Sequence, residues 1–217
     1  MAILLVSVLV GLCIGSFLNV VIYRLPIMLE RQWREESKAF IEEPESPSLA
    51  DIPETFNLSL PASGCPNCGH KIRPWENIPV LSFLLLRGKC SGCDTRISWR
   101  YPLIELTTGF LTLLIFVNSN TLMTALFGAV FTWVLVALTL IDWDTQLLPD
   151  NLTLPLLWLG LLVNSIGVFV PPQEAILGAA LGYGILWTVY WLFKLATGKE
   201  GMGYGDFKLL AALGALR

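Results

Sequence analysis

Long runs without a charged residue limit what this chain can fold into more than any other feature of its sequence. Residues 1–23 contain no Asp, Glu, Lys or Arg, and Leu122–Ile141 is another uncharged stretch of 20 residues. A helix needs about 20 apolar residues to cross the ~30 Å hydrocarbon core of a bilayer. A water-soluble core is excluded, because such runs leave no polar face for solvent. The sequence therefore predicts a membrane protein.

Five apolar runs approach the length of a membrane span, and a sixth begins near the end of the sequence. Besides Leu122–Ile141, the runs are Ala2–Tyr23, Leu103–Val117, Leu152–Val170 and Ala175–Phe193. The first lacks the basic start and the cleavage motif of a secretory signal peptide, so we expect it to be retained. The sixth starts at Phe207 and stops at Arg217, and its 11 residues would rise only about 16 Å as a helix. We predict an all-α polytopic membrane protein with about six transmembrane helices, the last truncated.

The basic residues predict how these helices are oriented. Twelve of the 14 Lys and Arg residues fall in segments 24–102 and 194–206, whereas the intervening loops 118–121 and 171–174 contain none. Basic loops stay on the cytoplasmic side during insertion. We therefore expect the N-terminus outside and segments 24–102, 142–151 and 194–206 inside.

The charge distribution also divides the chain. We expect a first transmembrane helix at 1–25, a small cytoplasmic zinc-binding insertion at 26–102, and a membrane core at 103–217 that is incomplete at its C-terminus. Within the insertion, we predict a short amphipathic helix at Met28–Ile41 and a solvated loop at Glu42–Ser59. The net charge of −3 gives no attraction to nucleic acid, so we expect no such partner.

The prediction of zinc rests on two CxxC pairs, Cys65/Cys68 and Cys90/Cys93, which 21 residues separate. Two such turns can aim four thiolates at one ion and form a closed tetrahedral site. Disulfides are the competing interpretation, but cytoplasmic thiols stay reduced. A redox-active CxxC would need only one pair, beside a βαβ pattern that is absent here. With four cysteines no position stays open for water, so we expect the metal to stabilise the insertion and not to catalyse. We expect His70 at the surface or beside the ligands.

Carboxylates within or beside the apolar runs are the candidate catalytic residues, because ionisable groups are costly in a membrane. Five qualify: Glu105, Asp142, Asp144, Asp150 and Asp206. The single histidine lies among the cysteines, so a Ser/His/Asp triad is not expected. Asp142 ends one run and Asp206 opens another, which suits a pair that shares one proton. On local evidence Asp206 could instead stabilise a helix N-terminus, Asp142 and Asp144 could mark the membrane border, and Asp150 could cap a helix.

Several longer motifs occur in order and together resemble those of one family. They are Gly-Ser-Phe-Leu-Asn-Val-Val-Ile-Tyr-Arg (15–24), the two CxxC pairs, Asn-Ile-Pro-Val-Leu-Ser (77–82), Arg-Gly-Lys-Cys (87–90), Arg-Tyr-Pro-Leu-Ile-Glu (100–105), the segment from Asp142 to Asp150, and Gly-Tyr-Gly-Asp-Phe-Lys (203–208). Over nearly its whole length the chain resembles the bacterial type IV prepilin leader peptidases, aspartic membrane enzymes of the GxGD type.

The resemblance implies a function, a location and a set of site residues. Such enzymes cut a short basic leader from type IV prepilins and type II secretion pseudopilins, after a glycine and usually before a phenylalanine. They act at the cytoplasmic face of the bacterial inner membrane, in contact with lipid, and commonly methylate the new N-terminus with S-adenosylmethionine. Asp142 and Asp206 match the two catalytic aspartates, and the four cysteines match the bacterial zinc-binding domain. The segment Gly201–Gly205 is not a Rossmann fingerprint, so the methyl donor rests on the resemblance alone.

Two other functions remain open. One is a related aspartic peptidase that acts on different signal-bearing proteins. The other is a membrane scaffold without catalysis, whose zinc domain binds a partner. The Asp142/Asp206 pair disfavours the scaffold, which gains nothing from two costly carboxylates.

Overall fold

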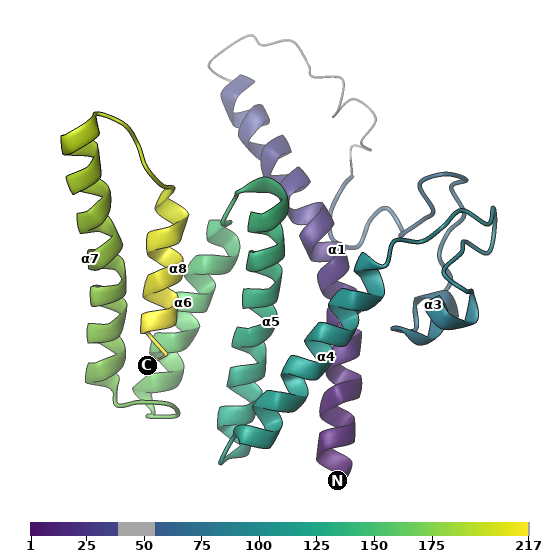
Figure 1. The fold of residues 1–217 in the computed structure, drawn as a ribbon, viewed down its shortest axis with the longest axis horizontal. Coiled ribbons are helices and arrows are strands. Elements are labelled where there is room, and N and C mark those ends of the chain that lie inside the picture. The colour runs from purple at the N-terminus through teal and green to yellow at the C-terminus, as the bar shows by residue number, and fades with distance from the viewer. Residues whose placement is uncertain (39–54, 217) are drawn as a thin grey trace. The chain divides into compact units, whose positions relative to one another are not determined.

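The computed structural model describes residues 1–38 and 55–216, and within these ranges the chain is helical without a β-strand (Figure 1). Isolated bridges join Gly64 to Lys71 and Lys89 to Arg96. The elements are α1 (Ala2–Lys38), η1 (Pro74–Asn77), α3 (Leu81–Leu85), α4 (Arg100–Asn118), α5 (Leu122–Thr145), α6 (Asp150–Ser165), α7 (Pro172–Thr197) and α8 (Tyr204–Gly214). The predicted all-α fold class is confirmed.

Each of the six apolar runs lies wholly or mostly in a helix, although α6 ends at Ser165, before the end of the predicted run at Val170. Four of these helices are long and apolar enough to cross a membrane. The four are α1, α4, α5 and α7. The helix α6 has 16 residues and α8 has 11. At 1.5 Å per residue these two helices rise about 24 and 16 Å, less than the thickness of the hydrocarbon core.

The first helix is longer than the sequence suggested. It continues without interruption through Pro26 to Lys38. Residues 28–38 are helical as expected, but they extend α1, so the prediction of a short helix of their own is wrong. Proline removes one backbone hydrogen bond, but ion pairs one turn apart support the polar end of α1. Arg34 lies 2.8 Å from Glu30, and a second pair follows at Arg31–Glu35. Most of the predicted loop at Glu42–Ser59 lies outside the described residues.

The chain forms two compact units, Met1–Val117 and Asn118–Arg217. In the first unit, glycines let α1 approach α4 closely. A Cβ atom on Gly11 would lie 2.6 Å from the Thr112 hydroxyl oxygen, and one on Gly15 would lie 2.7 Å from the Cα of Glu105. Small residues four apart allow this kind of close packing between membrane helices, where lipid supplies no hydrophobic driving force.

The second unit runs up and down through α5, α6, α7 and α8, and α8 packs against both α6 and α7 (Figure 1). Glycines again set the approach. A Cβ atom on Gly182 of α7 would lie 2.6 Å from the carbonyl oxygen of Leu210, and Gly214 of α8 faces the carbonyl of Gly178. The apolar core of this unit gathers Phe131, Leu138, Leu156 and Ala212.

A buried amide ties together the end of this unit opposite the aspartates. The Asn164 side chain donates from Nδ2 to the carbonyl oxygen of Ala215 at 2.7 Å. Its Oδ1 accepts from the backbone N–H groups of Phe169 at 2.9 Å and Val170 at 3.2 Å. One fully buried side chain thus joins α6, the connection to α7 and the end of α8.

Candidate functional site

The two candidate catalytic aspartates lie at the same end of the second unit. Asp142 is exposed in the last turn of α5, where its carbonyl oxygen accepts from the N–H of Gln146. Asp206 is half-buried in the first turn of α8. Because α5 ends where α8 begins, the two helices bring both residues to this end (Figure 1). An acidic residue in the first turn also suits the dipole of α8.

A close backbone approach holds the start of α8 against the connection between α5 and α6. A Cβ atom on Gly205 would lie 2.7 Å from Cβ of Leu148 and 3.2 Å from its carbonyl oxygen. Leu148 packs in turn on the apolar core of the unit. Only glycine fits at position 205, directly before Asp206. Gly203 has no such neighbour, since its nearest atom would lie 3.9 Å away.

An ion pair joins the same two segments. Lys208 Nζ lies 2.7 Å from each carboxylate oxygen of Asp150. The helix α6 has Pro149 at its N-cap position and Asp150 in its first turn, so the alternative of Asp150 as the cap is wrong. The carboxylate of Asp150 instead pairs with the ammonium group of Lys208. Lys208 lies one turn after the start of α8.

The other membrane-proximal carboxylates have different surroundings. Asp144 is exposed near the end of α5. Glu105 is buried in α4, where its Oε2 accepts from the backbone N–H of Val80 at 2.8 Å. It therefore fixes a loop of the insertion to α4 within the first unit, a role that the sequence analysis did not assign.

The four cysteines of the insertion form one cluster. Their sulfur atoms all lie within 4.8 Å of one another, and Cys65–Cys93 and Cys68–Cys90 are 3.8 and 3.9 Å apart. Four thiolates at about 2.3 Å from one zinc ion would be about 3.8 Å apart. The cluster therefore could hold a metal, and its sulfur atoms fit zinc in number and in spacing.

The surroundings of the cluster favour thiolates at some of its positions. The hydroxyl and backbone of Thr95, with the Asn67 amide, lower the pKa of Cys93 to about 6. Backbone hydrogen bonds at Cys68 and Asn67 lower the pKa of Cys65. A backbone bond at His70 lowers the pKa of Cys68, but the neighbouring Cys93 and burial outweigh it and raise this pKa to about 12. A metal would release the remaining protons as it binds.

A polar network links the two cysteine turns. His70 Nε2 lies 3.1 Å from Oε2 of Glu76 and 3.1 Å from the hydroxyl of Ser91. Ser91 also donates to Oε1 of Glu76 at 2.7 Å. The Arg73 N–H, Ser91 and His70 lower the pKa of Glu76 to about 2, so this carboxylate stays charged. His70 thus contacts η1 and the second cysteine turn.

Sequence reasoning missed Arg24 as an organiser of the insertion. It is buried at the end of the first apolar run, and its guanidinium donates to the carbonyl oxygens of Asn57 and Pro61, both at 2.8 Å. The ring of Phe56 lies 5.4 Å from the guanidinium carbon. An arginine directly after an uncharged run is the signal that could have identified it.

The glycine-rich segment before α8 does not have the setting of a nucleotide-binding loop. The segment Gly201–Gly205 connects helix α7 to helix α8, with no strand before it, so it lacks the strand–turn–helix setting of a nucleotide-binding loop.

Comparisons with known proteins match nearly the whole chain. The model of the bacterial peptidase A24 N-terminal domain matches residues 9–119, and that of the type IV leader peptidase family matches residues 129–217. The boundary between these matches lies close to the boundary between the two compact units. No solved structure matches the chain.

Three curated relatives give the level of similarity. A protein of Pseudomonas putida is 58% identical over 94% of this chain and 69% of its own length. One of Stutzerimonas stutzeri is 55% identical over 99% and 73%, and one of Neisseria gonorrhoeae is 55% identical over 94% and 71%. Each bears the name prepilin leader peptidase/N-methyltransferase.

Proposed function

The chain belongs to the type IV leader peptidase family, and we propose that it removes the leader from prepilins and then methylates the new N-terminus. The substrates are type IV prepilins and the pseudopilins of type II secretion. The methyl donor is S-adenosylmethionine, which the second half of the relatives' name implies. The protein resides in the bacterial inner membrane, with its N-terminus outside and both aspartates facing the cytoplasm.

We assign the peptidase chemistry to Asp142 and Asp206. The ionised member of the pair takes a proton from water as the water attacks the carbonyl carbon at the leader junction. The protonated member donates a hydrogen bond to the carbonyl oxygen as negative charge develops there. The cleaved amine then leaves with a proton from the pair.

The fixed position of Asp206 carries this assignment. The Gly205–Leu148 approach and the Lys208–Asp150 pair fasten the first turn of α8 to the chain that follows Asp142. Because Asp150 is engaged by Lys208, it is less suited than Asp142 to share a proton with Asp206. A scaffold without catalysis has no need of such positioning.

We assign the four cysteines to one zinc ion, which supplies folding energy to the insertion. Bound there, Cys65, Cys68, Cys90 and Cys93 would leave no coordination position for water. The insertion has no strands or long helices in the described part of 55–99, so metal binding would be a large part of its stability.

The test is cleavage of a purified prepilin by variants of the protein in detergent. Asn at position 142 or 206 keeps the shape of the side chain but cannot cycle a proton. We expect each single change to abolish cleavage and the double change to add almost nothing, since the pair acts as a unit.

The same variants separate the two activities. Methylation needs only the exposed amine, so Asp142→Asn and Asp206→Asn should still methylate a pilin whose leader has already been removed. Asp150→Asn is the matched control and should retain measurable cleavage. Substantial cleavage by either Asp142→Asn or Asp206→Asn would contradict the assignment.

A further inference from the structure

The short helix α3 presents an apolar face that no described residue covers. Leu81, Leu84 and Leu85 are 49%, 61% and 73% exposed, and their spacing of three and four residues places them on one side of the helix. Phe83 is buried and packs on the ring of Trp99, with centroids 4.7 Å apart. The three exposed leucines are called the α3 face below. Large exposed apolar patches mark interaction surfaces.

A hydrogen bond sets the level of α3 along α4. The N–H of Val80, directly before α3, donates to the buried carboxylate of Glu105 at 2.8 Å. Glu105 lies five residues after Arg100, the first residue of α4, which is about 7.5 Å along the helix axis. Figure 1 accordingly shows α3 beside the first turns of α4 and not beyond its end. Since α4 is one of the candidate membrane spans, α3 lies at the level where that span begins.

The backbone of this segment suits a lipid environment. The N–H groups of Ser82, Leu84 and Leu86 donate to carbonyl oxygens four residues back, at 2.9–3.1 Å. Gly88 closes the turn by donating to the carbonyl oxygen of Phe83 at 2.8 Å. Backbone groups near hydrocarbon must be paired internally, because no water is there to pair them.

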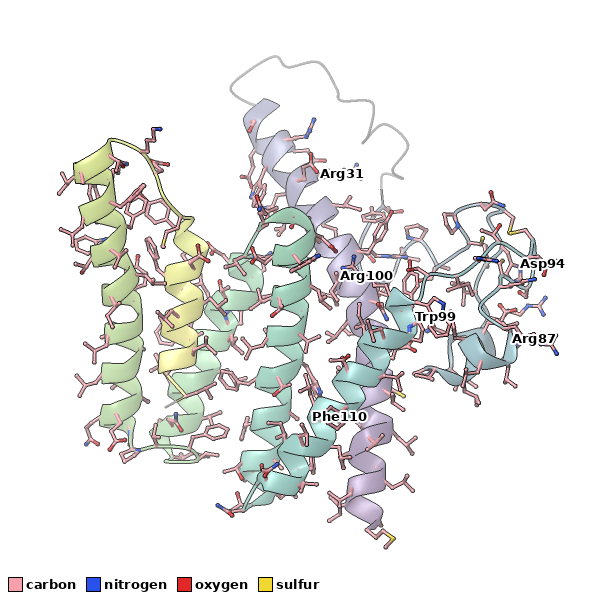
Figure 2. The ribbon with its side chains drawn as sticks, in the orientation of Figure 1. Arg31, Arg87, Asp94, Trp99, Arg100 and Phe110 are labelled. Atoms are coloured by element: carbon pink, nitrogen blue, oxygen red, sulfur yellow. The ribbon has the colours of Figure 1, made fainter. Side chains whose placement is uncertain are left out.

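The residues that flank the α3 face have the chemistry of a membrane interface. Trp99, which is 74% exposed, directly precedes α4, and tryptophan is enriched at the level of lipid headgroups. Arg87 and Lys89 follow α3 and are exposed, and basic side chains at this level attract anionic headgroups. In Figure 2, Arg87 and Trp99 flank α3, whereas Asp94 lies in a turn of the insertion away from that helix.

We propose that the α3 face is seated in the lipid–water interface, where Arg87 and Lys89 contact anionic headgroups. The level given by Glu105 agrees with the burial of interfacial helices, which is about 5–10 Å into the boundary of headgroups and acyl chains. The charges and the continuity with α4 favour lipid over a protein as the occupant. Glu105 is a positioning residue that holds α3 at this level. This lipid contact is separate from the peptidase and methyltransferase activities.

Site-specific photo-crosslinking tests the lipid contact in the full chain. Leu85 is replaced by p-benzoylphenylalanine, and the protein is placed in nanodiscs of phosphatidylethanolamine with a minority of phosphatidylglycerol. The matched control carries the same probe at Asp94. After irradiation, mass spectrometry should find lipid adducts at 85 and almost none at 94, with phosphatidylglycerol enriched over its share of the bilayer. The proposal would be overturned by equal adduct yields at both positions, by no adduct at 85, or by crosslinks to a second copy. Adducts in which phosphatidylglycerol is not enriched over its share of the bilayer would overturn the contact of Arg87 and Lys89 with anionic headgroups.

A second pair of variants tests the positioning by Glu105. Glu105→Gln keeps an acceptor oxygen for Val80 and should leave the adduct yield at 85 nearly unchanged. Glu105→Ala removes the acceptor and should lower the yield by up to about fivefold, the change in an equilibrium constant that one lost hydrogen bond causes. An unchanged yield in Glu105→Ala would refute the positioning role.

Discussion

A single added methyl group at Gly205 should disable cleavage, because the structure has no room for it. In Gly205→Ala the new Cβ would lie 2.7 Å from Cβ of Leu148, whereas carbon atoms in contact prefer about 3.5–4.0 Å. Leu148 cannot yield easily, since it packs on the core formed with Phe131 and Leu138. The first turn of α8 must therefore move by about 1 Å, at a cost of about 1–3 kcal/mol.

This displacement acts on the next residue, Asp206. A misplacement of about 1 Å in a catalytic group can lower the rate about 100-fold. We expect kcat for prepilin cleavage to fall by that factor while KM changes less, because the displacement acts on the position of a catalytic group. The assay is a time course of leader removal by purified protein, with thermal unfolding to show that the variant is folded.

Gly203 provides the matched control two residues earlier. A Cβ there would have no atom closer than 3.9 Å, and its φ of −79° and ψ of 153° are accessible to alanine. Gly203→Ala should therefore keep cleavage within a few-fold of the parent. Cleavage by Gly205→Ala at more than about half the parental rate, or an equal loss of activity in both variants, would show that the close approach to Leu148 does not position Asp206.

Three further predictions concern stability and metal. The Asp150–Lys208 pair is partly exposed, which limits its contribution to stability. Asp150→Asn and Lys208→Met should therefore each lower the free energy of unfolding by at most about 1 kcal/mol and the cleavage rate by less than tenfold. A double-mutant cycle should give a coupling energy that two independent residues would lack. Asn164→Leu leaves three backbone groups without their partner, so unfolding in detergent should occur at a clearly lower temperature, by an amount equivalent to about 3 kcal/mol or more; an unchanged midpoint would contradict this role. Cys65→Ser, or removal of metal with a chelator, should lower zinc content and the protease resistance of the insertion together, and a metal-free insertion that stays resistant would argue against a structural metal.

The apolar helices and the cysteine cluster were predictable, because each depends on residues that are close together in the sequence. An apolar run becomes a helix in a membrane because each backbone group finds its partner within the segment. Each CxxC turn places two sulfur atoms close together within four residues, so the pattern of two such turns predicts a four-sulfur cluster.

Pairings between distant residues were not predictable in this way. Lys208 pairs with Asp150, which lies 58 residues earlier in the sequence, and Glu105 accepts from the N–H of Val80, 25 residues earlier. Neither separation corresponds to a helix or strand periodicity that the sequence would reveal. Val80 has a φ of 60°, a conformation that a β-branched residue rarely adopts and that propensity alone argues against. The uninterrupted course of α1 was missed because the boundary of the first helix was placed where the charged residues begin. The helix continues past that boundary and through Pro26, and polar pairs support the next turns.

The hydrogen bonds of Asn164 have a consequence for the order of biosynthesis. Its amide donates to the carbonyl of Ala215, which the ribosome adds 51 residues later. At about 5–20 residues per second, the amide waits roughly 3 to 10 s for this partner. An unpaired amide is costly in hydrocarbon, and α6 is also short for a span. We therefore expect α6 to remain beside the insertion machinery until α8 has been made, so that a helix synthesised later completes the placement of an earlier one.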